Sequence, residues 1–224
     1  FDTRVGMGRS YCPLDKDLNF DEWCERIRQG ANYVSDGKSH IIDFKVNDAK
    51  MGEKNSELRL NRAKTVSVSA KVAAFLPETQ TEEGAAIAKN GLTGRPYWDI
   101  EKARIGPTRT VPVEVIVNGY PAGKTEIAAD GKWNDVEFDV PIEHSSWIAL
   151  RILPSSHTNP VFVLIDDKPI RASRRSAQWC VDSVEQCWKM KEPAIREGDK
   201  QAARAAYDVA RAAYERVLAE AVAE

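Results

Sequence analysis

The sequence predicts a mainly β protein with C-terminal helices: an antiparallel β-sandwich, immunoglobulin-like or jelly-roll-like, followed by a helical hairpin. Three observations support this fold class. From residue 39 onward, hydrophobic side chains recur at every second position, as in strands with one face in a core. Turns such as Asn118-Gly119 separate these strands, and no long helical pattern lies between them. After residue 173 the repeat lengthens to that of a helix.

Eight segments carry the strand pattern. They span residues 39–46, 57–60, 66–74, 111–117, 125–128, 136–142, 147–153 and 161–165. In the first of these we expect His40, Ile42, Phe44 and Val46 to share one face. The last two are almost continuously apolar, so we expect both of their faces to be buried.

Residues 77–110 interrupt the strands with prolines, glycines and polar residues. We expect a long loop here, with a helical turn around residues 82–90. Loops of this length in compact domains usually serve a site or an interface.

Before the strands, residues 19–30 predict one short helix. Asn19 is its expected N-cap and Gly30 its expected stop. Its apolar face consists of Phe20, Trp23, Cys24 and Ile27. A helix of about three turns is not stable alone in water, so we expect this face to cover another part of the protein.

The C-terminal region, residues 171–224, predicts two helices. The first begins near Ser173, and the second runs from Asp199 to about Ala223. Pro193 and Gly198 break the pattern between them, which indicates an antiparallel helical hairpin. We expect its aromatic side chains to pack on the sandwich.

The composition excludes several function classes. The chain has 224 residues, and its 32 Lys and Arg nearly balance 34 Asp and Glu, for a net charge of -2. No basic region stands out, so we expect no nucleic-acid partner. No apolar run approaches about 18 residues, so we expect no membrane insertion. The start, Phe1-Asp2-Thr3-Arg4, lacks an initiator Met and a signal core, which is typical of a mature product or a piece of a longer protein.

Four cysteines stand at positions 12, 24, 180 and 187. Neither close pair has the Cys-x2-Cys spacing of a zinc knuckle. Cys180 and Cys187 lie about 10 Å apart along a predicted helix, too far for a disulfide. A bridge between Cys12 and Cys24 is possible, but buried free thiols are the interpretation that the sequence favours.

The chain offers no complete set of catalytic groups. Its three histidines, His40, His144 and His157, are isolated, and no His-x-His or His-Glu-x-x-His pair occurs. Gly-x-Ser-x-Gly, Gly-x-Gly-x-x-Gly and P-loop patterns are also absent from the sequence. We therefore assign no catalytic and no metal-binding residue.

Two polar clusters are candidates for binding or for contact between domains. The first is His157, Thr158 and Asn159, in a turn between two predicted buried strands. Its side chains could face a pocket or an adjoining domain, or could bond their own backbone to shape the turn.

The second cluster crowds the start of the first C-terminal helix. It consists of Arg171, Arg174 and Arg175, whose charges oppose the helix dipole. An anion or carboxylate could compensate them. The alternative is solvated charges with salt bridges to nearby acidic residues.

The N-terminal strings Gly8-Arg9-Ser10-Tyr11, Phe20-Asp21-Glu22-Trp23 and the segment 27–37 resemble a known family. They are similar to the closing segment of the catalytic domain in the CehA/McbA-like branch of PHP-type (polymerase and histidinol phosphatase) metallohydrolases. Residues 145–151 and 155–163 resemble the last strands of that branch's accessory sandwich. The resemblance covers essentially the whole chain, and it is to the C-terminal part of a longer protein.

The resemblance implies an upstream barrel-like catalytic domain on the same polypeptide. That domain would hold two or three divalent metal ions and hydrolyse a phosphoester or related bond with metal-activated water. The family's metal ligands, including its opening His-x-His, are missing from these residues, so we expect no cofactor in this chain. Residues 1–38 would be the end of the catalytic domain, 39–170 the sandwich and 171–224 the hairpin. Because bacterial relatives often look secreted or periplasmic, the resemblance allows export of this chain, but the sequence itself does not determine its location.

Two functions of different classes follow. The first is a non-catalytic accessory domain that supports the upstream domain, with self-association through the residue 20–27 helix face as a further possibility. The second is a free-standing β-sandwich module that binds carbohydrate or protein. An exposed line of aromatic rings would favour the second, and their burial would favour the first. The rings concerned are Tyr97, Trp98, Tyr120 and Trp133.

Overall fold

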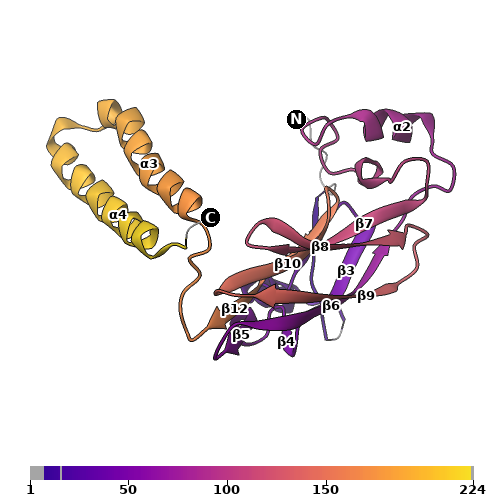
Figure 1. Cartoon of the computed structure of the whole chain (residues 1–224). Helices are drawn as coiled ribbons and strands as arrows, with labels where there is room; N and C mark the ends of the chain where they lie inside the picture. The colour runs from indigo at the N-terminus through magenta and orange to yellow at the C-terminus, as the bar shows by residue number, and fades with distance from the viewer. Residues whose placement is uncertain (1–7, 16, 223–224) are drawn as a thin grey trace. The chain divides into compact units, whose positions relative to one another are not determined.

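The computed structural model describes residues 8–15 and 17–222 and divides the chain into two compact units (Figure 1). The first is Phe1–Lys168 and the second is Pro169–Glu224. Phe1-Asp2-Thr3-Arg4, which lacks an initiator Met and a signal core, lies outside the described residues. Ala223, the expected end of the second C-terminal helix, also lies outside them.

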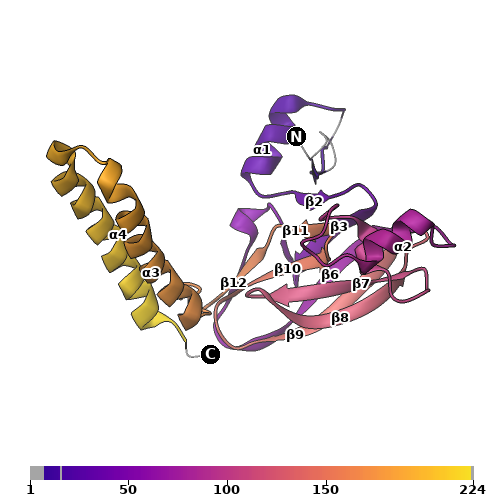
Figure 2. The ribbon, with the colours of Figure 1, turned by 90° about the horizontal axis from the view of Figure 1, so that it is seen from above.

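The first unit consists of two β-sheets packed face to face (Figure 2). The smaller sheet is antiparallel, with the order β4 (Ala49–Lys50), β3 (Ser39–Val46), β6 (Lys64–Ala74) and β9 (Asn134–Ile142). The larger sheet contains β1 (Arg9–Tyr11), β2 (Tyr33–Ser35), β5 (Glu57–Leu60), β7 (Thr110–Val117), β8 (Tyr120–Ala128), β10 (Ser146–Ile152), β11 (Ser156–Thr158) and β12 (Val161–Ile165). This confirms the predicted antiparallel sandwich.

Strand β10 organises the larger sheet. It pairs with β7 and also with β12 and β11, whose registers differ by one residue. This one-residue shift in register falls between β11 and β12, at Asn159-Pro160, where the pairing with β10 is interrupted. Beyond it, β11 pairs with β2, and β12 pairs with β5 in the sheet's parallel ladder.

The core lies between the sheets and is made of aliphatic side chains. Its fully buried members include Ile41, Val66, Val68, Val113, Ile148 and Leu150. Each buried aliphatic side chain contributes roughly 1.5–3 kcal/mol relative to an exposed one. The predicted face of β3 was wrong, because Asp43 has a φ of 55° and forms a bulge that changes the phase of the strand. Ile41, Phe44 and Val46 therefore point into the core, and Ile42 does not.

The long loop has the predicted helical turn. Helix α2 (Glu82–Lys89) packs on a 3-10 turn, η2 (Ile100–Ala103), at one end of the sandwich. A buried ion pair fixes this loop: Arg104 Nε and Nη2 donate to both carboxylate oxygens of Glu101 at 2.8 and 3.0 Å. Arg104 also donates to the carbonyls of Pro77 and Thr108, which brings both ends of the loop together.

Helix α1 (Phe20–Arg28) has the predicted limits. The Asn19 side chain accepts from the Glu22 amide at 3.0 Å, and Gly30 follows the helix with a φ of 74°. The part of the chain that the structure describes does not supply the expected cover over its apolar face: no residue of α1 is buried, and Phe20 is 74% exposed.

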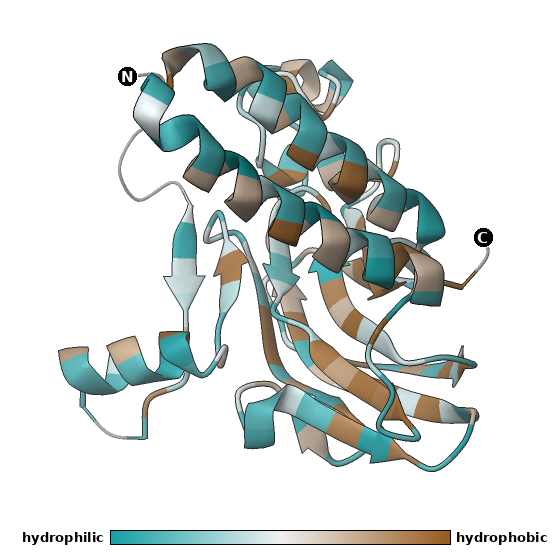
Figure 3. Cartoon of the chain, turned by 90° about the vertical axis from the view of Figure 1, so that its left-hand side faces the viewer, coloured by the Kyte–Doolittle hydropathy of each residue, from teal (hydrophilic) through white to brown (hydrophobic). Residues whose placement is uncertain are grey.

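The second unit is the predicted hairpin of α3 (Arg174–Lys191) and α4 (Lys200–Glu220), joined by the short turns η3 (Glu192–Ala194) and η4 (Glu197–Asp199). Both helices are largely hydrophilic, with scattered apolar residues (Figure 3). Trp188 packs edge-on against Tyr207 at 5.3 Å, and the Arg204 guanidinium lies 5.1 Å from the Trp188 ring centre. The packing of this hairpin on the sandwich stays a prediction.

Replacing the buried carboxylate should destabilise the first unit. Glu101→Gln leaves the Arg104 charge without a counter-ion, and we expect the free energy of unfolding to fall by about 3 kcal/mol. The hydrogen bonds from Arg104 hold the pKa of Glu101 below its ordinary 4.5. The stabilisation is therefore present above pH 4.5 and is lost as the pH falls through the folded pKa.

Urea unfolding of both proteins between about pH 7 and pH 3 measures this difference. The two stabilities should converge at the acid end. The exposed Glu126→Gln on β8 is the matched control and should leave stability unchanged. A constant gap between wild type and Glu101→Gln across the whole pH range would contradict the assignment.

Candidate functional site

A groove of about 900 Å³ lies between the N-terminal segment and the outer face of the smaller sheet. One wall comes from Tyr11, Cys12, Pro13, Asp15, Arg26, Ala31 and Tyr33. The rest comes from β3, from the β4 turn at residues 50–53, and from residues 69–71 of β6 and 135–137 of β9. We call this the Tyr11 groove. Its size is at the upper end of the range for small-molecule sites.

The wall is fixed to the sandwich by close backbone packing. A Cβ on Gly52 would lie 2.2 Å from the Cβ of Ala31, so only glycine allows this approach. The φ of Gly52 is +82°, which also favours glycine. The Asn159 side chain adds two hydrogen bonds, to the carbonyl of Gly30 at 3.2 Å and to the Asn32 side chain at 2.7 Å. The groove is therefore a preformed feature of the fold.

An aromatic cluster supports the wall. Tyr11 stacks on Tyr33, with ring centres 5.2 Å apart and planes 12° apart. His40 meets both rings edge-on, and Trp133 lies 6.5 Å from His40. Tyr33 is buried, whereas Tyr11 is partly exposed and lines the groove. The buried ring of Tyr33 thus holds the ring of Tyr11 in place.

The Tyr33 hydroxyl lies 2.7 Å from Nδ1 of His40. Burial raises the pKa of Tyr33 to about 12, and burial lowers the pKa of His40 from its ordinary 6.5. At neutral pH the tyrosine is therefore protonated and donates its O–H to a neutral imidazole. This arrangement positions rings and supplies no nucleophile.

The charges around the groove nearly cancel. The cations are Arg26, Lys45, Lys50 and Lys71, and the anions are Asp15, Asp43, Glu53, Asp135 and Glu137. Arg26 pairs with Asp15 at 2.8 Å, and Lys71 stands opposite Asp135 in the β6–β9 ladder. The groove therefore offers hydrogen-bond donors next to hydrogen-bond acceptors, and its net electrostatic field is weak.

The first predicted polar cluster lies on and just after β11. His157 is exposed, and its Nδ1 is 3.2 Å from the carbonyl oxygen of Thr158. Thr158 is buried, and its hydroxyl accepts from the Leu150 amide at 3.1 Å. Asn159 bonds the segment that follows α1, as described above. The structure places the Thr158 and Asn159 side chains in bonds that shape the fold.

The second predicted cluster lies in the other unit, at the open end of the hairpin. Arg171 Nε donates to Glu220 at 2.7 Å, and Arg174 Nη1 donates to the Leu218 carbonyl at 3.2 Å. Arg175 is exposed. Two of the three arginines thus hold the end of α4.

Among the described residues, the cysteines and histidines form neither a disulfide nor a cluster that could hold a metal ion. All four cysteines are free thiols, so Cys12 and Cys24 are not bridged. The expected burial was wrong, because Cys24 is exposed and the other three are partly exposed. Within residues 8–15 and 17–222, no three His, Cys, Asp or Glu side chains are placed to hold a metal ion. Among the same residues, no helix is long and apolar enough to cross a membrane.

The exposed line of aromatic rings that would favour a binding module is not formed, although several of the rings are exposed. Tyr120 is 62% exposed and Trp133 is 51% exposed, but Tyr120 begins β8 of the larger sheet, whereas Trp133 directly precedes β9 of the smaller sheet. Tyr97, 40% exposed, packs beside Trp98 in the long loop. The rings are scattered over three places.

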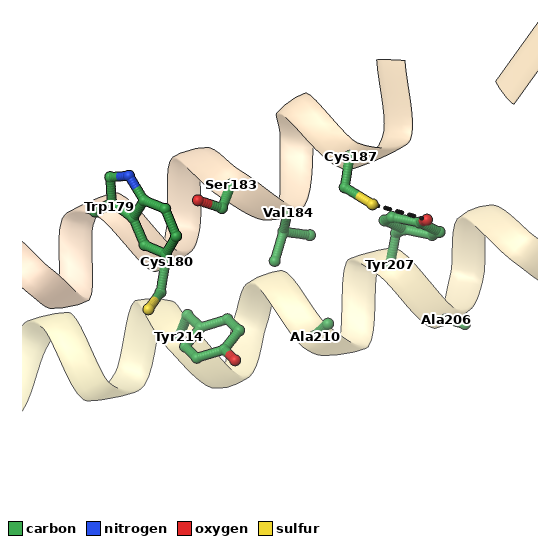
Figure 4. Close-up of a pocket in the computed structure, with 9 residues that line it drawn as sticks. All are labelled: Trp179, Cys180, Ser183, Val184, Cys187, Ala206, Tyr207, Ala210 and Tyr214. Carbon is green, nitrogen blue, oxygen red and sulfur yellow. Dashed lines mark hydrogen bonds between the residues drawn. The ribbon is translucent and has the colours of Figure 1, made fainter. Parts of the chain in front are cut away.

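A second, smaller pocket of about 350 Å³ lies between α3 and α4 (Figure 4). Trp179 and Tyr214 border it, and Cys187 Sγ lies 3.4 Å from the Tyr207 hydroxyl. The lining is largely apolar, and Trp179 is 70% exposed. The pocket offers an apolar surface, and none of its lining residues is a charged group that could orient a ligand.

Sequence reasoning missed the groove because its walls come from distant segments. A signal was present in the strands themselves. Ser69 and Lys71 alternate with buried residues of β6, as Asp135 and Glu137 do in β9. These alternate positions mark one polar sheet face. Comparison of the chain with protein-family models, curated proteins and solved structures finds no significant match.

Gly52→Ala should loosen the groove wall. The added methyl group meets Ala31, and the positive φ adds backbone strain, so we expect a loss of at least about 2 kcal/mol in the free energy of unfolding. Chemical denaturation measures it. Gly91→Ala is the control, since no atom lies within 4 Å of the added Cβ, and it should change stability by less than about 1 kcal/mol. Equal effects of the two substitutions would refute the packing argument.

The Tyr33–His40 pair predicts a defined titration. By NMR, His40 should titrate below 6.5, and Tyr33→Phe should raise its pKa, because the hydrogen bond to the neutral ring is lost. The folded protein binds this proton less readily than the unfolded chain, so stability falls as the pH drops below 6.5. A His40 pKa at or above 6.5 in the wild type would be incompatible with the buried pair.

Proposed function

We propose that this chain is the non-catalytic accessory part of a PHP-type metal-dependent hydrolase, in which the β-sandwich supports an upstream catalytic domain. One observation carries the proposal: helix α1 presents an exposed apolar face, and Ala31 and Asn32, which follow the helix, are fixed to the sandwich. Phe20 is 74% exposed, and its ring stacks on Trp23 with centres 6.0 Å apart. Exposed apolar surface of this kind is typical of an interaction site.

The base of α1 supports the same function. Ala31 packs against Gly52 and Asn32 bonds Asn159, directly after the helix ends. Strand β2 then continues the larger sheet through β11. A domain that covers α1 would therefore be held in a fixed position by the sandwich, as a supporting module requires.

The sequence suggests which domain this is. Gly8–Tyr11 consists of β1 and the residue before it, and Phe20–Trp23 begins α1. Both segments resemble the closing segment of the PHP-type catalytic domain. The metal-activated water of that family would belong to the upstream domain. The residues of this chain would contribute support and positioning.

A free-standing module that binds carbohydrate or protein is the second candidate. The exposure of Tyr120 and Trp133 favours it, because exposed rings stack on sugars and on partner side chains. Their separation on the sandwich gives them no common surface. The open face of α1 favours the accessory domain.

Reading the coding sequence on the 5′ side of the Phe1 codon tests the proposal. We expect an open frame that continues into a His-x-His motif and further His, Asp and Glu ligands. A start codon or a signal peptide directly before Phe1 would overturn the proposal and favour the free-standing module.

A second test uses the longer polypeptide. Phe20→Ser with Trp23→Ser removes the apolar face of α1, and we expect the single thermal transition to split into two as the domains uncouple. Leu92→Ser is the matched control, because Leu92 is 55% exposed in the long loop. An unchanged single transition in the double variant would show that α1 holds no partner domain.

A further inference from the structure

We propose that the Tyr11 groove binds a short neutral oligosaccharide. This inference goes beyond the accessory function and does not depend on it. It rests on three properties of the groove: a prepared aromatic wall, a balanced set of charges and a rigid frame. Each of these matches what a sugar chain requires from a protein surface.

The aromatic wall is held in place before any ligand arrives. Tyr11 is partly exposed to the groove and stacks on the buried Tyr33, and the hydroxyl of Tyr33 is bonded to His40. An aromatic ring at a groove wall offers a flat apolar surface for the C–H face of a sugar ring. Because Tyr33 and His40 already fix the orientation of Tyr11, binding would cost little side-chain entropy.

The charges select against ionic ligands. Four cations and five anions surround the groove, so neither a polyanion such as nucleic acid nor a polycation meets a favourable field. Several opposite charges stand next to each other, as Arg26 does beside Asp15 and Lys71 opposite Asp135. A hydroxyl group both donates and accepts hydrogen bonds, so it can bridge such pairs. A ligand rich in hydroxyl groups is the class that uses them best.

The floor comes from the outer face of the smaller sheet. Ser69 and Lys71 on β6 face Glu137 and Asp135 on β9 across the ladder. Regular strands hold these side chains at fixed spacing, and sites built on such elements are more precise than sites on loops. The volume of about 900 Å³ leaves room for more than one sugar ring.

Titration of the whole 224-residue chain with neutral trisaccharides tests the proposal. The probes are cellotriose, xylotriose, mannotriose, maltotriose and N,N′,N″-triacetylchitotriose at millimolar concentration, followed by ¹H–¹⁵N NMR and calorimetry. We expect at least one sugar to shift the amides of Tyr11, Lys71 and Asp135 together. Tyr11→Ala and Asp135→Ala should each weaken binding at least tenfold.

The matched control is Tyr120→Ala, an exposed tyrosine outside the groove, which should leave the affinity unchanged. Circular dichroism checks each fold, and Tyr11→Leu with Lys71→Gln replaces any variant that unfolds. Absence of groove shifts with all five sugars would overturn the proposal. Shifts centred on Tyr120, or groove binding of inorganic phosphate or a tripeptide in place of sugars, would also overturn it.

This result is separate from the test of the accessory function. The coding sequence decides whether an upstream catalytic domain exists, whereas the titration decides whether the groove takes a sugar. Either result can fail without the other.

Discussion

The alternation of side chains in β3, β6 and β9 is the constraint on which the rest of the first unit depends. In a strand, successive side chains point to opposite faces. Val66 and Val68 therefore fill the core, and Ser69 and Lys71 stand on the outer face as the groove floor. The bulge at Asp43 changes the phase of β3, so that Phe44 and Val46 are buried in the core and Lys45 lines the groove. The inner face of the smaller sheet therefore forms part of the core, and its outer face forms the floor of the Tyr11 groove.

The N-terminal segment belongs to the sandwich and extends beyond it. β2 is a strand of the larger sheet, and Ala31 packs on Gly52 at a distance that no side chain at residue 52 would allow. Helix α1 ends at Arg28, only a few residues before Ala31, and leaves Phe20 exposed. A segment that is rigid at one end and apolar at the other is suited to connect two domains. The same rigidity gives the groove its wall, so support and binding would share one structural element.

Polar interactions add to hydrophobic burial in the long loop and in the hairpin. In the loop between β6 and β7, Leu76 and Ile100 are buried in the core, and the Glu101–Arg104 pair with its bonds to Pro77 and Thr108 defines the path of the backbone between them and β7. In the hairpin, no residue of α4 is fully buried, and Arg204 contributes a contact to Trp188 and an ion pair with Glu185. Exposed pairs of this kind are individually weak. The hairpin is therefore stabilised by several small contributions.

The sequence alone determined the fold class, because the period of the hydrophobic pattern depends on local geometry. It also determined both ends of α1, since Asn19 and Gly30 act within one helical turn. It did not determine the face of β3, because a bulge at Asp43 depends on pairing with β6. Nor could it place His40 against Tyr33, or Ala31 against Gly52, since these contacts join segments whose approach is decided by sheet pairing. The tertiary structure alone decided the groove, because its walls come from residues separated by more than a hundred positions and brought together by burial of the common core.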